Sequence, residues 1–152
     1  KFRNAPGTLR ELFSRIVFNI LVGNTDDHAR NHAAFWDGQM LTLTPAYDIC
    51  PQARHGQIAT QAMLVMGDDR SSRITTCIAA APQFLLTEDE AVNIIAKQIQ
   101  CIEQNWATVC DDASLSEVDR NLLWGNQILN PYIFEGLEPG PLKDLARRHE
   151  RG

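Results

Sequence analysis

The sequence predicts a mainly α-helical domain that contains one small β-hairpin. Apolar residues recur at helical spacing in several stretches, whereas one pair of short strand-like runs flanks a turn-forming dipeptide. The chain has 152 residues, 44% of them hydrophobic, which suffices for one domain with a substantial core. We expect this domain to cover residues 1–137. A flexible tail, with Pro, Gly and charge but little to bury, is expected over residues 138–152.

The first predicted helix covers about residues 9–21. Thr8 can act as its N-cap, and apolar residues then recur on one face as far as Leu21. Gly23 follows, at a position where helices commonly end. Residues 24–31 are polar and offer few apolar side chains to bury, so a loop is expected there.

Residues 32–44 predict a β-hairpin. Two strand-like runs lie on either side of the dipeptide Asp37-Gly38, which is typical of tight turns between strands. The second run leads directly to Asp48. Because a hairpin reverses the chain, its two ends lie close together, and we expect Asp48 to return to the polar loop.

The next segment, residues 54–70, is expected to be a loop that includes one more short strand at residues 61–65. A short helix is expected over residues 72–80. Two capping boxes follow, each with a Ser or Thr three residues before a Glu, and each predicts the start of a further helix. They are Thr87 with Glu90 and Ser114 with Glu117.

Several classes of protein are disfavoured by composition. The net charge of −5 argues against direct binding to nucleic acid, which needs a basic face. No apolar run approaches the roughly 18 residues of a membrane span, and no signal peptide opens the chain. The four cysteines lack CxxC spacing, so reduced, mostly buried thiols in a cytoplasmic protein are expected. They are Cys50, Cys77, Cys101 and Cys110.

The residues that could carry chemistry are Asp26, Asn31 and Asp48. Four residues separate Asp26 from Asn31, and the hairpin should bring Asp48 beside them. Carboxylate and amide oxygens suit Mg²⁺, which also takes waters and phosphate oxygens. Phosphoryl transfer needs such ligands together with a carboxylate that accepts the proton of the attacking hydroxyl. The order D-x-x-x-x-N, hairpin, D is that of a kinase catalytic loop and its metal aspartate.

A loop rich in Asp and Asn is, by itself, more often a solvated turn than a site. Three features favour a site here. His28 completes the pattern D-x-H-x-x-N, the hairpin follows at once, and the hairpin leads to the pair Tyr47-Asp48.

The segments from Leu21 to His32 and from Leu43 to Ile49 resemble the catalytic region of HipA-like serine/threonine kinases, the toxins of bacterial toxin–antitoxin modules. The resemblance is strong over residues 9–51 and weaker to residue 137. It implies the C-terminal, helical lobe of a protein-kinase-like fold, without the N-terminal lobe. It also implies transfer of the ATP γ-phosphate to a hydroxyl of a bacterial protein.

The resemblance implies a role for each of the four residues. Asp26 would be the catalytic base, and Asn31 and Asp48 would hold Mg²⁺ against the β- and γ-phosphates of ATP. His28 would donate a hydrogen bond to the transferred group, or else brace the loop. Asp27 and Arg30 are expected to stabilise the loop as an ion pair. Tyr47 is expected to pack.

The parts of a kinase that clamp ATP have no counterpart in this sequence, since it has neither G-x-G-x-x-G nor a lysine on a strand after such a turn. We therefore expect them to precede this segment in a longer protein, and the segment alone to be inactive. The expected partners are ATP, a protein substrate and an antitoxin, which would provide an indirect link to DNA, but no membrane.

Two other functions remain open. The first is a non-catalytic module, either antitoxin-docking or pseudokinase-like, against which the intact D-x-H-x-x-N and Asp48 argue. The second is the lobe of a small-molecule or lipid kinase, which shares D-x-H-x-x-N. The context Tyr47-Asp48-Ile49 favours the HipA-like kinases over it.

Overall fold

The computed structural model describes residues 1–53 and 58–149. Within these ranges the chain is mainly helical, with a single two-stranded antiparallel hairpin, so the prediction of a mainly α-helical domain with one small hairpin is confirmed. No described helix is long and apolar enough to cross a membrane. The elements are α1 (Ala5–Leu21), the 3₁₀ turn η1 (Ala29–Asn31), β1 (Ala34–Trp36), β2 (Leu41–Leu43), α2 (Ile74–Ala80), η2 (Ala81–Phe84), α3 (Glu88–Asp112), α4 (Glu117–Leu123), η3 (Pro131–Phe134) and α5 (Pro141–Ala146).

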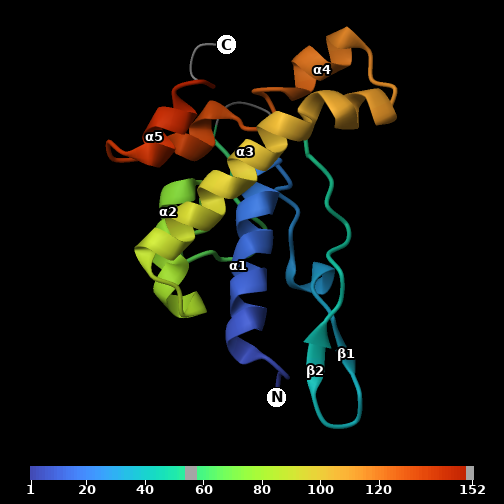
Figure 1. The fold of residues 1–152 in the computed structure, drawn as a ribbon, viewed down its shortest axis with the longest axis vertical. Helices are drawn as coiled ribbons and strands as arrows, with labels where there is room; N and C mark the ends of the chain where they lie inside the picture. The colour runs from blue at the N-terminus through green and yellow to red at the C-terminus, as the bar shows by residue number, and fades with distance from the viewer. Residues whose placement is uncertain (54–57, 150–152) are drawn as a thin grey trace.

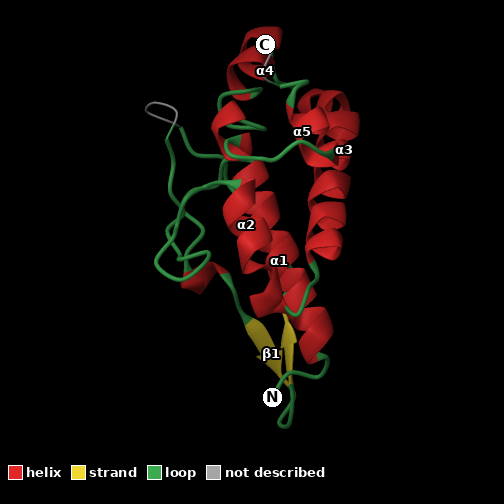
Figure 2. Ribbon diagram, turned by 90° about the vertical axis from the view of Figure 1, so that its left-hand side faces the viewer, coloured by secondary structure: helices red, strands yellow, loops and turns green. Residues whose placement is uncertain are grey.

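Helices α1, α2 and α3 pack against one another and enclose the hydrophobic core. α3 runs across α1, and α5 lies against α3 (Figure 1). The hairpin projects at the end of the molecule that carries the N-terminus, away from α4 (Figures 1 and 2). The side chains with no exposure include Val17, Ile20, Leu21, Ile74, Ile95 and Ile99.

Helix α1 begins earlier than predicted. Its N-cap is Asn4, whose side chain accepts a hydrogen bond from a backbone amide of the first turn, and Thr8 lies inside the helix. Pro6 favours this start because proline fits the first turn, where its missing N–H costs nothing. The predicted end is confirmed, since the helix stops at Leu21 and Gly23 follows with φ +70°.

The predicted hairpin is confirmed, with Ala34 opposite Leu43 and Trp36 opposite Leu41. Residues 37–40 connect the two strands, and the Asp37 amide donates to the Met40 carbonyl at 3.3 Å across this turn. The Asp37 carboxylate also accepts hydrogen bonds from the amides of the two residues that follow Gly38. On the side away from β1, β2 also pairs with the N-terminal segment through an isolated parallel bridge between Phe2 and Leu41.

The capping box that opens α3 is confirmed. The Thr87 hydroxyl accepts from the Glu90 amide at 3.2 Å, and the Glu90 carboxylate accepts from the Thr87 amide at 2.9 Å. The second predicted box is wrong, because α4 is capped by Ser116, whose hydroxyl accepts from the amide of Asp119. Ser114 instead adopts φ +54° in the turn between the two helices.

The strand predicted at residues 61–65 is wrong. In the described part of residues 54–70, only isolated bridges form, between Thr60 and Ser71 and between Met66 and Asp69. Residues 54–57 of this predicted loop lie outside the described residues. The short helix predicted over residues 72–80 is confirmed as α2.

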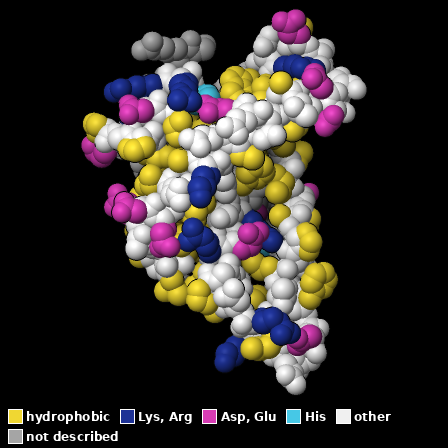
Figure 3. Space-filling view, in the orientation of Figure 1, with side chains coloured by type: hydrophobic (Ala, Val, Ile, Leu, Met, Phe, Trp, Pro, Cys, Tyr) yellow, Lys and Arg dark blue, Asp and Glu magenta, His cyan; other side chains and the backbone are white. Residues whose placement is uncertain are grey.

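The prediction of a flexible tail is wrong for the described residues 138–149. Pro141 opens α5, and Leu142, Leu145 and Ala146 are buried, on the side of the helix that packs against α3. Three apolar residues at helical spacing therefore outweigh the Pro, Gly and charge that suggested a tail. On the face drawn in Figure 3, basic and acidic side chains are interspersed over the helices.

Candidate functional site

The four predicted residues lie on the loop after α1 and on the segment that leaves the hairpin. Asp26 is exposed in the turn that follows α1, and Asn31 is buried at the end of η1. His28 is half-buried between them, and Asp48 is exposed beyond β2. The loop therefore begins near the exposed carboxylate of Asp26 and ends at the buried side-chain amide of Asn31.

Asn31 reaches back to the start of this loop. Its side-chain nitrogen Nδ2 donates to the backbone carbonyl of Asp26 at 3.4 Å, a long hydrogen bond. Its backbone amide donates to the carbonyl of His28 at 2.8 Å and closes the 3₁₀ turn. Because the amide nitrogen is directed to the backbone, the amide oxygen is the atom of Asn31 that can serve a cation.

Asp48 is held against the loop by two hydrogen bonds. The side chain of Asn24 donates to the carbonyl of Asp48 at 3.3 Å, and the hydroxyl of Tyr47 donates to the carbonyl of Arg30 at 2.7 Å. The predicted return of the hairpin to the loop is therefore confirmed. Tyr47 was expected to pack, and the contact that it makes with the loop is the hydrogen bond from its hydroxyl.

The backbone of Asp48 adopts φ +58°, in the left-handed region. Residues other than glycine are uncommon there, although Asp and Asn tolerate it better than most. Such conformations persist where the surrounding contacts fix them, and they cluster at functional sites. The hydrogen bond from Asn24 to the Asp48 carbonyl is one such contact.

Asn24 and Asn19 were missed by sequence analysis. Asn24 is 2% exposed, and its Nδ2 also donates to the side-chain oxygen of Asn19 at 3.0 Å. Asn19 interrupts the apolar stripe of α1 and is equally buried. That interruption was the available signal, because a polar residue on a buried helix face requires a partner. The pair connects the end of α1 to the backbone of Asp48.

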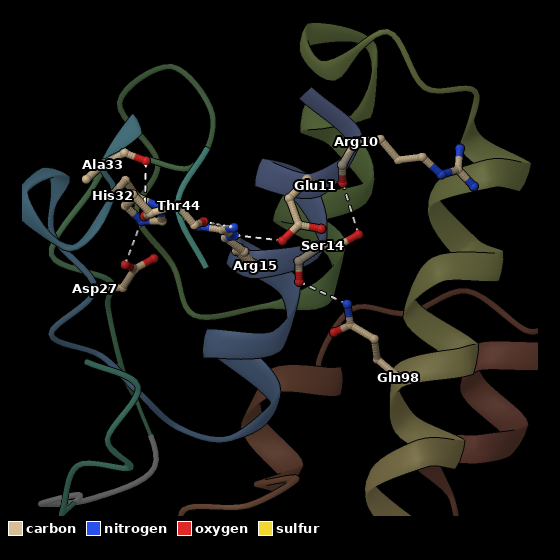
Figure 4. A network of polar contacts seen from close by, with 9 residues as sticks. All are labelled: Arg10, Glu11, Ser14, Arg15, Asp27, His32, Ala33, Thr44 and Gln98. Carbon is tan, nitrogen blue, oxygen red and sulfur yellow. Dashed lines mark hydrogen bonds and ion pairs between the residues drawn. The ribbon is translucent and has the colours of Figure 1, made fainter. Parts of the chain in front are cut away.

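The ion pair predicted between Asp27 and Arg30 is wrong. Asp27 is 4% exposed and pairs with His32, whose Nε2 lies 2.8 Å from the carboxylate (Figure 4). Arg30 is exposed and contributes its backbone carbonyl to the contact with Tyr47. The pair Asp27–His32 thus stabilises the loop in place of the expected one.

His28 contributes its backbone carbonyl to the turn that ends at Asn31. Its ring nitrogen Nδ1 is buried and has no hydrogen-bond partner among the described residues. The backbone of His28 therefore forms part of this turn. The predicted hydrogen bond from His28 to a transferred phosphoryl group stays a prediction.

A buried arginine fastens the hairpin to α1. Arg15 donates from its guanidinium to the carbonyl of Thr44 at 2.7 Å and to the carboxylate of Glu11 at 2.8 Å (Figure 4). The amide and hydroxyl of Thr44 both donate to the carbonyl of Ala33. These contacts fix the strand ends that lead from Asn31 into the hairpin and from the hairpin to Asp48.

The side chains of Asn31 and Asp48 are of the chemical types that bind a magnesium ion whose other ligands are phosphate and water. Among the described residues, no group of three or more His, Cys, Asp or Glu side chains could hold a metal by itself. Mg²⁺ seldom needs such a cage, because it retains waters and binds through one or two carboxylates plus substrate phosphates. The amide oxygen of Asn31 and the exposed carboxylate of Asp48 are hard oxygen ligands of the required kind.

A large cavity lies elsewhere, with a volume of about 1120 Å³. It is lined by residues of α4, of the turn at 124–127 and of the segment after α5, and by none of the four predicted residues. The loop with Asp26 and Asn31 therefore does not line this cavity.

The family described as HipA-like C-terminal domain matches residues 2–106. This range contains α1, the loop, the hairpin and Asp48, so all four predicted residues fall within it. No match was found among curated proteins or among solved structures. Since the match covers more than half of the sequence, the chain belongs to the family of HipA-like C-terminal domains, as the resemblance of its motifs implied.

Proposed function

We propose that this HipA-like C-terminal domain carries the catalytic base and the metal ligands of an ATP-dependent serine/threonine protein kinase. The observation that supports it best is the pair of hydrogen bonds, from Tyr47 to Arg30 and from Asn24 to Asp48, that holds the Asp48 segment against the loop. These contacts join the segments that bear the D-x-H-x-x-N motif and the following aspartate, which phosphoryl transfer requires in one place.

In this proposal Asp26 orients the hydroxyl of a serine or threonine and accepts its proton as the hydroxyl attacks the γ-phosphorus of ATP, whose bond to the bridging oxygen breaks so that ADP leaves. Its exposure supports this role, because a protein substrate must reach the carboxylate from solvent. The neighbouring Asp27 does not compete for the role, since it is buried and paired with His32.

Asn31 and Asp48 would hold Mg²⁺ through the amide oxygen and the carboxylate. The ion, when bound, neutralises charge on the β- and γ-phosphates of ATP. His28 lies between Asp26 and Asn31 along the loop and would donate a hydrogen bond to the transferred phosphoryl group. The buried Asn24 and Asn19 keep the Asp48 backbone in its left-handed conformation, which directs the carboxylate.

The parts that clamp the triphosphate are proposed to lie in another segment of the parent protein. Two observations support this: the sequence lacks a glycine-rich phosphate loop, and the loop with Asp26 and Asn31 does not line the large cavity beside α4. The domain alone is then expected to be inactive. We further propose that the whole kinase is the cytoplasmic toxin of a toxin–antitoxin module, with a bacterial protein as its substrate and an antitoxin as its partner.

Metal binding can be tested on the 152-residue chain. Mn²⁺ replaces Mg²⁺ at oxygen sites and broadens the NMR signals of nearby amides. Titration with Mn²⁺ should broaden the amides around Asn31 and Asp48 first, and Asp48→Asn should remove this selectivity. Asp112→Asn, at an exposed position at the end of α3, is the matched control and should leave it unchanged. Broadening that begins elsewhere would contradict the proposed metal site.

Catalysis is tested in the full-length parent protein. Asp26→Asn should lower phosphotransfer by roughly a hundredfold or more while the fold is retained, as expected for loss of a general base. Unchanged phosphotransfer would reject Asp26 as the base. Absence of phosphotransfer in the unsubstituted parent, with Mn²⁺ bound at Asp48, would favour the non-catalytic module.

A further inference from the structure

We infer that Asp27 and His32 are positioning residues, which set the separation between the catalytic base Asp26 and the metal ligand Asn31. The inference rests on the proposed function, because it concerns how the same loop is kept in its working conformation. Neither residue is expected to touch substrate or metal. Both act through the residue that precedes them in the chain.

The geometry of the loop supports this inference. The side chain of Asn31 reaches back five residues to the backbone of Asp26, and the side chain of His32 reaches back five residues to the carboxylate of Asp27. The two links therefore join the same two ends of the loop, one residue apart. The first is a long hydrogen bond of 3.4 Å, whereas the second is a contact of 2.8 Å between a ring nitrogen and a carboxylate. The shorter link is the one that can fix the spacing.

Burial gives the second link its strength. The side chain of Asp27 is 6% exposed and that of His32 is 16% exposed. A carboxylate withdrawn from water needs a hydrogen-bonded partner, and removing that partner leaves the buried group uncompensated. Any motion that separates the two ends of the loop must break this contact. Asp26, which directly precedes Asp27, is itself exposed.

The His32 end of the link is anchored to α1. His32 precedes Ala33, whose carbonyl accepts from the amide of Thr44 at 3.0 Å, and the carbonyl of Thr44 accepts from the buried Arg15. Figure 4 shows this series of contacts, from Asp27 through His32, Ala33 and Thr44 to Arg15 and Glu11. Asp27 lies on the part of the loop that begins where α1 ends. The link thus completes a series of contacts from the loop through Ala33 and Thr44 back to Arg15 of α1.

The experiment compares His32→Leu with His32→Gln in the 152-residue chain. Gln keeps a side-chain N–H donor that can face the Asp27 carboxylate, whereas Leu has no donor. The matched control is His149→Leu. His149 makes a similar contact, 3.0 Å from its Nε2 to the carboxylate of Glu103, but it fastens the segment after α5 to α3.

Two measurements are made on each variant. The first, without metal, is hydrogen exchange of the Asn31 backbone amide, which donates to His28. The second is the Mn²⁺ dissociation constant from the broadening of amides near Asp48. In His32→Leu, the exchange rate of the Asn31 amide and the Mn²⁺ dissociation constant should each rise by about tenfold or more, since tenfold is the usual effect on metal affinity of losing a group that orients a metal ligand. His32→Gln should restore most of both values, and His149→Leu should change neither.

The outcomes separate the inference from the proposed function. If the unsubstituted chain binds Mn²⁺ at Asp48 and His32→Leu binds it equally well, the positioning role is wrong and the metal site stands. If His32→Gln is as impaired as His32→Leu, the donor is not what matters, and the positioning role is again wrong. If the unsubstituted chain does not bind Mn²⁺ near Asp48, the metal site of the proposed function fails, and the role of the pair toward it fails with it.

Discussion

The side chain of Asn24 donates to the backbone carbonyl of Asp48, across 24 residues of sequence. The same nitrogen donates to Asn19 in the last turns of α1. One buried amide thus joins the rigid helix, the polar loop and the segment after the hairpin. The hydrogen bond from Asn24 helps to explain why the Asp48 backbone stays in the left-handed region, which most residues avoid.

Asn24→Ala should destabilise the chain by about 2–3 kcal/mol, because it leaves the buried oxygen of Asn19 and the carbonyl of Asp48 without their donor. Urea unfolding followed by circular dichroism measures the change. Asn93→Ala, at an exposed position of α3, should alter the free energy of unfolding by less than about 0.5 kcal/mol. Equal effects of the two substitutions would show that the Asn24 hydrogen bonds contribute nothing to stability.

Substitutions of Asp48 should separate metal binding from backbone strain. Asparagine tolerates the left-handed region, whereas alanine does not, so Asp48→Ala should be less stable than Asp48→Asn by about 1 kcal/mol. Both should weaken Mn²⁺ binding, because each removes the carboxylate. If Asp48→Asn bound Mn²⁺ as tightly as the unsubstituted chain, Asp48 could not be a metal ligand.

The parts of the fold that sequence analysis predicts correctly are those encoded by local patterns. The apolar spacing of α1, the Asp-Gly turn and the capping box of Thr87 and Glu90 each lie within a few residues of sequence. Where two local patterns compete, the prediction fails. Ser114 and Ser116 both precede an acidic residue by three positions, and only the hydrogen bond from Asp119 to Ser116 decides between them.

In the candidate site, too, the residues that form a local sequence pattern are predicted and the contacts between distant residues are not. Asp26, His28, Asn31 and Asp48 are recognisable because their spacing along the chain is itself a pattern. The contacts that support them join side chains which the sequence does not relate, such as Arg15 with Thr44. Asp27 is an instructive case, since the sequence offered both Arg30 and His32 as partners and the structure pairs its buried carboxylate with His32.

The four cysteines should divide into two classes of reactivity. Cys50 and Cys101 are exposed, and Cys77 and Cys110 are buried. Burial raises the pKa of the Cys77 thiol to about 12, so little thiolate forms at neutral pH. A disulfide reagent should therefore modify two thiols rapidly in the native protein and all four in urea, as counted by mass spectrometry.

Cys50→Ser is the control for the assignment of the fast class and should remove one rapidly modified thiol. Labelling of Cys77 at the rate of Cys50 would contradict its burial in the core.

The capping box should make stability depend on pH. Hydrogen bonds from the backbone amide and then the hydroxyl of Thr87 lower the pKa of Glu90, and Arg10 adds to this. A carboxyl whose pKa is lowered by folding stabilises the native state above its unfolded pKa, and this contribution is lost as the pH falls through the folded pKa. Glu90→Gln should therefore be destabilising at neutral pH, and the difference should shrink below about pH 4.

Urea unfolding at a series of pH values measures this difference. In a Thr87→Ala background, which removes the hydroxyl, adding Glu90→Gln should have a smaller effect on the pH dependence. A difference that grew on acidification would show that the pKa of Glu90 is raised by folding.

Gly23 lies against the backbone of a distant segment of the chain. Its φ is +70°, and a Cβ atom there would lie 2.6 Å from the backbone oxygen of Gln127. Its carbonyl also accepts from the amide of Gln52, beyond Asp48. Gly23→Ala should therefore cost roughly 3 kcal/mol or more, since a backbone oxygen cannot move aside as a flexible side chain would.

Gly125→Ala is the matched control, with φ +77° and no atom within 4 Å of a Cβ. It should cost about 1 kcal/mol, the strain of the left-handed backbone alone. The difference in free energy of unfolding between the two variants isolates the contact with Gln127. If that difference is absent, the turn after α1 is free to shift, and the approach of residues 124–128 does not fix the start of the loop that carries Asp26.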